Sequence, residues 1–522
     1  MSQTTSTREN GIVAYVQDVD NDIYVVTVDA RTSRIAKNNV KIGSCKKFVM
    51  EIPKLFKRDI KAVIFNVFGV ESSHFSNNYA FCKAIKVKLD QMKLSYSFVD
   101  AYQHLCSYLL IDNNVAVGIG ESVLIVLVNK KGIHSMDLRY TKDGYELQGS
   151  TPYFPFNPAE SHETIGQKIM GTSNPKKIIV SPNAPGYPVM KYIKQILNHK
   201  DVIVAEYEVY KHDQKFVTET AKYLFDKSYT KYWIIPRLSY GYSIQLSTGN
   251  AKIIDLMFIL PPVQLPVEKE IICERSLFNF SFLQINPQLI TEEPLEHFLF
   301  PKNCHQVKLN ISIDQNHFPS FQVSPEMIPK IEFLPEFLNR HVPSEAPVIG
   351  FFANSSVILH RKNGRYQFLD SWNGVYGREL LISFATKKPT FMEDAAEDLR
   401  TKPSYVVLDL MRITSMPINE IKHNGPWNFK FTKDVDHPLL IEFDKADGSR
   451  GAAAPAFLMA MLLKEHLKAL KDETGNKPKK IVFCLLDDYK MDERQRIEEQ
   501  FEEACKLLKV ETSYLFYFLL TV

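Results

Sequence analysis

The sequence lacks paired cysteines, long apolar runs and a strong excess of either charge. Its seven cysteines are odd in number, lie far apart and form no CxxC pair, which favours reduced thiols in the cytoplasm or the nucleus. No apolar stretch reaches the roughly 18 residues of a membrane span, so we expect no membrane association. The formal net charge is only +3 and no long basic run occurs, so we expect no direct binding of nucleic acid.

The 522 residues, 45% hydrophobic and 24% charged, have the composition of a globular chain. Strand-like and helix-like segments alternate through the front of the chain, which predicts an α/β fold. The expected elements are a β-hairpin over 11–29 that turns at 20–22, a strand over 61–69, a helix over 77–94, a second strand and helix over 95–110, a hairpin over 113–140, and a strand, loop and helix over 176–198.

The pattern then changes twice. Residues 236–323 contain short, proline-rich strands and predict a separate all-β unit. In its segment SLFNFSF, Phe278, Phe280 and Phe282 alternate onto one side of a strand, the side that we expect to face the core. Later, α/β alternation returns, with a helix over 449–473, a strand over 479–486, and a helix over 492–508 that Asp492 is expected to cap.

The order of segments near the end of the chain resembles the nucleotide-binding domain of the 70-kilodalton heat-shock chaperone family. The hairpin VIGFFANSS, the stretch FMEDAAEDLRTKPSYVVLDLMRITS, the motif GPWNFKF and a final strand and helix follow one another as in the first half of that domain. The resemblance covers residues 346–522 and implies an actin-like (ribonuclease-H-like) first lobe there.

The front of the chain resembles other parts of the same family, in the right order. VAVGIGESVLIVLV resembles the second phosphate hairpin, and IIVSPNAPGYPVMKYIKQIL resembles the loop that holds adenosine. PRLSYGYSIQLSTG and HQVKLNISIDQNHFPSFQV resemble the start and the end of the substrate-binding β-sandwich. The resemblance implies a nucleotide-binding segment, mostly second lobe, over 1–235, a β-sandwich over 236–323, a connector over 324–345 and a first lobe over 346–522. Two decayed tandem copies and one permuted bilobed domain both fit this order.

The first hairpin has lost the chemistry that the resemblance implies. Gly350 lies on its first strand, but Phe352 stands where the family has a magnesium-orienting aspartate. Phenylalanine neither ligates magnesium nor accepts a proton from water. Asn354, Ser355 and Ser356 stand for the family's Gly-Thr-Thr turn, and we expect the two serines to be turn residues.

The other two nucleotide loops have changed as well. In the second hairpin Gly118 replaces an aspartate, and Glu121 and Ser122 replace glycines. A carboxylate inside a phosphate cradle repels the ligand. Gly118 and Gly120 are better explained by a tight turn between strands than by phosphate binding. In the adenosine loop Ser181 and Pro182 replace paired glycines, and proline removes a backbone donor.

No other constellation predicts catalysis or metal binding. Asp487 and Asp488 fit the solvated start of a helix better than a metal pair. His297, Cys304 and His305 carry ligand atoms, but their spacing fits no zinc pattern. We therefore expect no catalytic residue, no metal and no bound cofactor.

Together these patterns predict a non-catalytic, chaperone-like protein, a pseudo-ATPase that binds a protein partner as a scaffold or adaptor in the cytoplasm or nucleus. One alternative is an ATP-dependent protein-folding chaperone with unusual nucleotide loops, for which ATP and magnesium would be cofactors. A more remote alternative is a component of a ribonucleoprotein or nuclear regulatory complex.

Overall fold

The computed structural model describes residues 11–19, 22–71, 74–130, 132–149, 153–182, 187, 189–197, 201–205, 213–247, 253–287, 289–342, 344–421 and 427–515. The chain divides into two compact units. Unit 1 comprises Met1–Leu238, Pro262–Val267 and Ile313–Phe318, and unit 2 comprises Ser239–Pro261, Glu268–Ser312 and Pro319–Val522. Helices and sheets occur in both units, so the predicted mixed α/β class is confirmed. Most of the β-rich residues, Ser239–Pro261, Glu268–Ser312 and those from Pro319, thus share a unit with the C-terminal residues, and the finer division at 235, 323 and 345 stays a prediction.

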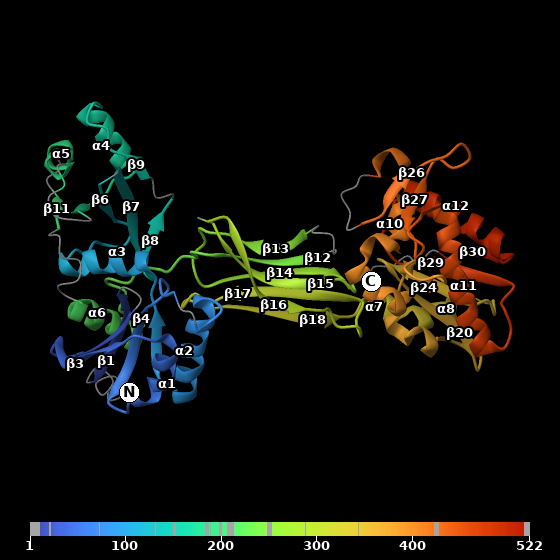
Figure 1. Ribbon diagram of the computed structural model, residues 1–522, viewed down its shortest axis with the longest axis horizontal. Helices are drawn as coiled ribbons and strands as arrows, with labels where there is room; N and C mark the ends of the chain where they lie inside the picture. Colours follow the sequence, from blue (N-terminus) through green and yellow to red (C-terminus); the bar gives the residue numbers. More distant parts are fainter. Residues whose placement is uncertain are drawn as a thin grey trace. The chain divides into compact units, whose positions relative to one another are not determined.

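Unit 1 contains two sheets with the same connectivity (Figure 1). In each, three antiparallel strands follow one another, and two later strands add in parallel beside the first. The first sheet has the order β3-β2-β1-β4-β5, with strands β1 (Ile12–Val19), β2 (Asp22–Asp29), β3 (Arg34–Ile42), β4 (Ile60–Asn66) and β5 (Ser95–Phe98). The second has the order β11-β10-β6-β7-β8, with β6 (Ser122–Val128), β7 (Gly132–Thr141), β8 (Gly144–Gln148), β10 (Lys177–Pro182) and β11 (Val202–Val204), while β9 (Tyr153–Pro155) also pairs with β7.

Helices cover both faces of the first sheet. Ala14 and Val16 of β1 pack in a core with α1 (Cys45–Leu55) and α2 (Asn78–Met92). Val13 and Tyr15 point the other way, into a core with α3 (Ala101–Asp112) and α6 (Asp213–Phe225) that also contains β6 residues. Because alternate residues of β1 enter different cores, this strand is apolar on both faces, as parallel sheets require. The remaining helices of unit 1 are α4 (His162–Met170) and α5 (Val189–Ile196).

The β-rich part of unit 2 consists of two sheets. The four-stranded sheet is antiparallel and contains β13 (Ile253–Ile259), β12 (Gly241–Ser247), β15 (Asn279–Asn286) and β16 (Thr291–Phe298) in that order. The three-stranded sheet contains β14 (Val267–Glu274), β17 (Gln306–Ile313) and β18 (Pro319–Glu326). Rings of Phe282 and Phe298 contact Phe321 of the second sheet, each with centroids 4.9 Å apart. Phe278, Phe280 and Phe282 are buried, so the prediction for this face is confirmed.

The C-terminal part of unit 2 repeats the connectivity of unit 1. Its sheet has the order β21-β20-β19-β29-β30, with β19 (Val348–Phe352), β20 (Ser355–Lys362), β21 (Arg365–Phe368), β29 (Lys480–Leu485) and β30 (Glu511–Leu515). Helices α7 (Pro329–Glu332) and α8 (Leu334–His341) precede it, and α11 (Pro455–Thr474) and α12 (Met491–Leu508) follow its meander. Between β21 and α11 the chain inserts the short strands β22 (Arg378–Glu379), β23 (Ile382–Ser383), β24 (Thr390–Phe391), β25 (Val406–Val407), β26 (Lys430–Thr432), β27 (Leu440–Asp444) and β28 (Arg450–Ala453), the helices α9 (Ala396–Thr401) and α10 (Leu410–Ser415), and the 3-10 turns η1 (Asp370–Trp372), η2 (Gly374–Tyr376), η3 (Met392–Ala395), η4 (Pro403–Tyr405) and η5 (Ile418–Glu420).

Two local predictions at the C-terminal helices are wrong. The helix expected from 449 begins at Pro455, because residues 450–453 pair with β27 as strand β28. Asp492 does not cap α12. The cap position is Lys490, whose N–H donates to Glu493 Oε2 at 2.8 Å, whereas Asp492 lies in the first turn and pairs with Arg496 at 3.0 Å. An acidic side chain in a first turn stabilises a helix through the dipole and not only as a cap.

No helix in the described ranges combines the length and hydropathy needed to cross a membrane. The hairpin turn expected at residues 20–22 lies mostly outside the described residues, although β1 and β2 pair as predicted.

Candidate functional site

The tip of the β19–β20 hairpin is tighter than the sequence predicts. The strands pair as far as Phe352 and Ser355, so the turn consists of Ala353 and Asn354 alone. Ser355 and Ser356 are 2% and 0% exposed and belong to β20. The expectation that both serines are turn residues is therefore wrong. Small hydroxyl side chains are common in turns, but they also fit a strand that is buried on both faces.

The polar groups at this tip are engaged inside the protein. Asn354 Oδ1 accepts a hydrogen bond of 2.9 Å from Asp409 N. The Ala353 N–H donates to Asp487 Oδ2 at 2.7 Å. Ser356 Oγ lies 2.8 Å from Nε2 of the buried His466. The groups that the resemblance assigns to phosphate binding are thus committed to internal hydrogen bonds.

A buried arginine from the β-rich part docks against this hairpin. Arg275, which follows β14, is 7% exposed. Its Nη1 donates to the carbonyl oxygens of Lys302, Cys304 and Tyr376 at 3.0, 2.9 and 2.9 Å. Long charged side chains are almost never buried unless they are paired. Three carbonyl acceptors within the chain supply part of that pairing.

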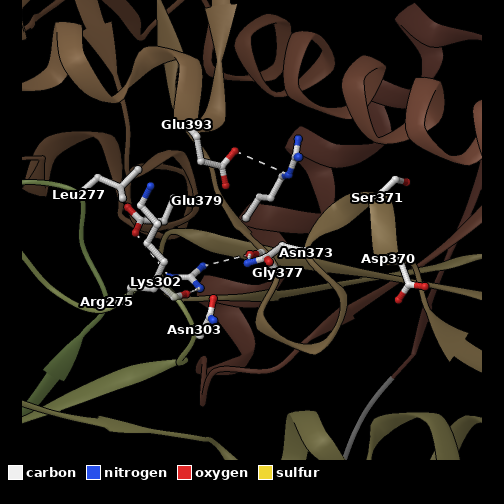
Figure 2. A pocket seen from close by; sticks show the side chains of 11 residues that line it. Arg275, Leu277, Lys302, Asn303, Asp370, Ser371, Asn373, Gly377, Glu379 and Glu393 are labelled. Atoms are coloured by element: carbon white, nitrogen blue, oxygen red, sulfur yellow. Dashed lines mark hydrogen bonds and ion pairs between the residues drawn. The ribbon is translucent and has the colours of Figure 1, made fainter.

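The other two nitrogens of the guanidinium also face the C-terminal part. Its Nη2 donates to Ser355 Oγ at 3.1 Å and to the Gly377 carbonyl at 3.4 Å, and its Nε lies 3.5 Å from Glu379 Oε1 (Figure 2). Gly377 has a φ of 66°, and a Cβ there would lie 2.3 Å from the Ser356 carbonyl oxygen, so glycine is required for this close approach. Arg275 therefore joins the β-rich part to the hairpin tip through side chains and backbone of both.

The pKa of the Glu379 carboxyl group is strongly raised. Burial raises the pKa of Glu379 to about 8, against the opposing effect of the Arg275 charge. The long 3.5 Å approach of Arg275 Nε is an ion pair rather than a strong hydrogen bond. The free-energy cost of desolvating this carboxyl group is thus larger than the stabilisation from its ion pair with Arg275.

The chemistry around Ser355 suits a cation and not a phosphate. The groups beside the hairpin that meet Arg275 include the Gly377 carbonyl, the Ser355 hydroxyl and the Glu379 carboxyl group, all of which act as acceptors towards it. Phosphate sites need N–H donors and positive charge. The guanidinium fills the position instead, so the side chain of Ser355 is not free to hold an anion.

Phe352 and Gly350 serve packing. Phe352 is 1% exposed and belongs to a core with residues of α7, α8, β20 and β29. Its ring centroid lies 5.2 Å from that of His305, whose Nδ1 accepts from Ile328 N at 2.8 Å and whose Nε2 lies 2.7 Å from the Val375 carbonyl oxygen. A Cβ on Gly350 would lie 3.0 Å from side-chain atoms of Leu486 and of Val357. Neither residue faces a space in which a metal could bind.

In unit 1 the residues that resemble the family's second phosphate hairpin do not lie in a hairpin turn. Gly118 and Gly120 lie before β6, whereas the link between β6 and β7 is closed by a hydrogen bond from Gly132 N to Asn129 Oδ1. The expectation of a strand-to-strand turn at these glycines is therefore wrong. Glu121 Oε2 accepts from Gly118 N at 2.9 Å, so the carboxylate closes its own turn, and that bond lowers the Glu121 pKa. Ser122 is the first residue of β6.

The third predicted loop, which should hold adenosine, lies at the opposite end of the paired strands β6 and β10 from Ser122. Ser181 and Pro182 end β10, are buried, and pair with Leu127 and Val128 of β6. Six strand residues, roughly 20 Å, therefore separate them from Ser122. The two predicted groups cannot form one cradle. Residues 183–186 of the expected adenosine loop lie outside the described residues.

The candidate metal groups do not come together. Asp487 accepts from Ala353 N, whereas Asp488 is exposed and lies 3.7 Å from Lys330 Nζ. Among the described residues no three His, Cys, Asp or Glu side chains are placed to hold a metal ion.

Two cavities flank the Arg275–Glu379 pair. The apolar cavity, of 490 Å³, is lined by Leu246, Leu256, Ile272, Phe278, Phe280 and Phe300 of the β-rich part, by Leu381, Leu399 and Leu408, and by polar groups that include Glu274, Asp409 and Arg412. The charged cavity, of 360 Å³, is lined mostly by charged and amide side chains (Figure 2). Arg275 and Glu379 line both cavities and form the wall between them.

Sequence reasoning missed Arg275 and Glu379. The only local signal is an arginine in the loop CERS between two apolar strands, and such residues are usually exposed. No protein-family model matches the sequence, and a search of curated proteins found no match.

Proposed function

We propose that this chain is a non-catalytic, chaperone-like protein that binds protein partners as a scaffold or adaptor. The observation that carries the proposal is the Arg275 guanidinium on Ser355 and Gly377, where a nucleotide-binding hairpin would hold phosphate. Acceptors fully engaged by an internal cation leave no place for ATP at this hairpin. All seven cysteines are free thiols, which supports a reducing compartment, the cytoplasm or nucleus.

The repeated connectivity supports actin-like lobes. Three sheets share the order in which a meander is followed by two parallel strands, two in unit 1 and one at the C-terminal end. Because unit 1 already contains two such sheets from consecutive chain, we favour decayed tandem copies over one permuted domain. The β-rich sheets, with their shared phenylalanine core, support a sandwich like the family's substrate-binding domain.

The apolar cavity is where we place the partner. Residues of both β-rich sheets line it, and Ile272 among them is 58% exposed. In the resembled family, the sandwich takes up extended apolar peptide segments. An apolar side chain of a partner would gain about 25 cal/mol per Å² buried in such a cavity.

Purified full-length chain is expected neither to hydrolyse ATP above background nor to change its unfolding temperature with ATP or ADP and magnesium. A bound nucleotide at about 100 times its dissociation constant would raise stability by roughly 2.7 kcal/mol, which calorimetry resolves easily. Turnover that depends on Ser355 or Ser356 would overturn the proposal and favour an ATP-dependent chaperone.

A charge in the apolar cavity is expected to abolish partner recovery. We expect Ile272→Lys to lose the main protein recovered with tagged wild-type chain from cell extract, because an ammonium group in the cavity opposes entry of an apolar side chain. Ile253→Lys is the matched control, since Ile253 lies on the edge strand β13, is 56% exposed and does not line the cavity. Equal recovery with both variants would place the partner elsewhere.

A further inference from the structure

Residues 31–61 of unit 1 are far more basic than the rest of the chain. They contain ten lysine and arginine residues and only two acidic residues, a local excess of eight positive charges, whereas the whole protein has a net charge of +3. Strand β3, helix α1 and the start of β4 lie in this stretch. Such a concentration of one charge attracts an oppositely charged partner, although the net charge of the whole chain is small.

Helix α1 presents this charge on the side that faces away from the core. Its inward side is apolar and buried, and consists of Cys45, Phe48, Val49 and Ile52. The opposite side carries the exposed residues Lys46, Lys47 and Lys54. Met50, which is 68% exposed, lies among them. Positions three and four apart are neighbours on a helix surface, so lysine side chains flank Met50 on both sides along the helix.

Few of these charges are neutralised within the protein. The ion pairs of the stretch are Lys37–Asp59, Lys41–Asp22 and Lys47–Glu51, the last at 4.0 Å. Within the described ranges, no acidic side chain pairs with the other exposed cations of α1 and of the residues just after it, Lys46, Lys54, Lys57 and Arg58. These four cations can therefore pair with carboxylates of another molecule.

Helix stability does not explain the two lysines at the start of α1. Ser44 caps the helix by accepting a hydrogen bond of 3.4 Å from Lys47 N, so Lys46 and Lys47 lie in the first turn, which contains no acidic residue. The helix dipole favours negative charge at this end and disfavours positive charge. Sequences depart from such local rules mainly at functional sites. The two lysines thus indicate that the charged face has a function beyond the stability of α1.

The composition of this face distinguishes between the classes of anionic partner. Helices that lie on membranes carry several large apolar side chains beside their charges, but Met50 is the one large apolar side chain that α1 exposes. Proteins that read nucleic acids offer arginine, asparagine or glutamine to base edges, or aromatic rings to unpaired bases. The outward side of α1 contains none of these residue types. Ammonium groups around one apolar side chain fit an acidic protein segment best.

We propose that the outward face of α1, together with Lys57 and Arg58 beyond its end, docks an acidic segment of a partner protein. The carboxylates of the segment pair with the cations, and an apolar side chain between them packs on Met50. From Lys46 to Lys54 the helix rises about 12 Å, the length of about four residues of extended chain. This surface belongs to unit 1 and the apolar cavity of the proposed function to unit 2, so either proposal can fail without the other.

Fluorescence anisotropy of a labelled peptide, Glu-Glu-Leu-Glu-Glu, titrated with the full-length protein tests this docking. We expect saturable binding at low salt, at least about tenfold tighter than for Gln-Gln-Leu-Gln-Gln, and several-fold weaker binding at about 0.15 M salt, where exposed charges are screened. Lys54→Gln with Lys57→Gln should weaken peptide binding roughly three- to tenfold, as expected for the loss of two exposed ion pairs. Lys464→Gln with Lys468→Gln makes the same change of charge on exposed positions of α11 and should leave binding unchanged.

Met50→Ser examines the apolar contact. It should weaken binding of the leucine peptide by about threefold or more and leave binding of Glu-Glu-Ser-Glu-Glu unchanged, because only leucine gains from packing on the methionine. All substituted side chains are exposed, so the variants should unfold at the wild-type temperature.

Three results would overturn the proposal. The first is no peptide binding at low salt, or equal binding by the two double-lysine variants. The second is tighter binding of an RNA oligonucleotide of equal charge, or of vesicles that contain phosphatidylserine, than of the peptide. The third is salt-sensitive self-association that Lys54→Gln with Lys57→Gln abolishes, because the face would then bind a second copy of this chain.

Discussion

Replacing Arg275 by methionine is expected to destabilise unit 2 by about 3–5 kcal/mol, because several buried acceptors each lose a hydrogen bond worth about 1–3 kcal/mol. Methionine keeps much of the side-chain volume but removes every donor. The carbonyl oxygens of Lys302, Cys304 and Tyr376 lose a partner, as does Ser355 Oγ. Glu379 then remains buried without its cation. Urea denaturation combined with hydrogen exchange of peptides from 346–379 measures the loss within unit 2.

Two variants show whether the loss comes from the buried charge. Arg450→Met removes an arginine of similar size from an exposed pair with Glu442, and should cost less than about 1 kcal/mol. The double variant Arg275→Met with Glu379→Leu should recover part of the stability, because it leaves no carboxyl group buried without a hydrogen-bond partner. If Arg275→Met is as mild as Arg450→Met, the guanidinium does not hold the β-rich part to the hairpin.

Replacing Phe352 by aspartate is expected to unfold the C-terminal part rather than restore a magnesium site. Removing a buried phenylalanine ring costs about 3–5 kcal/mol, and burying a carboxylate in its place adds several more. Phe352 is 1% exposed, so the new charge has no route to water without disrupting the core around α7 and α8. Soluble yield and thermal unfolding of the full chain measure the effect.

Phe352→Leu provides the control, because it shortens the side chain without burying a charge and should lower the unfolding temperature far less. A Phe352→Asp variant with wild-type stability and magnesium-dependent ATP binding would contradict this account. It would show that the acid alone had been lost and that the cradle around it remains.

The prediction that Ser355 and Ser356 lie in the hairpin turn failed for a physical reason. Sequence placed Asn354, Ser355 and Ser356 in one polar turn because each residue type is common in turns. The register of β19 against β20 decides otherwise, and register depends on which faces are buried. The same limit applies to Gly118 and Gly120, since glycine marks a turn but not which strands it joins. Asn129 and Gly132, between β6 and β7, are also an asparagine and a glycine.

The sequence by itself determined the elements whose signals are local. Apolar runs on either side of a polar turn predicted β1 and β2, alternating phenylalanines predicted β15, and a helical period predicted α2 and α12, because these patterns depend on neighbours a few residues apart. Only the tertiary structure decided that the Arg275 side chain is buried and which groups it binds. Its hydrogen-bond partners lie between 27 and 102 residues away along the chain. Burial of a cation is favourable only when folding gathers such distant acceptors around it, and no pattern in the local sequence specifies that arrangement.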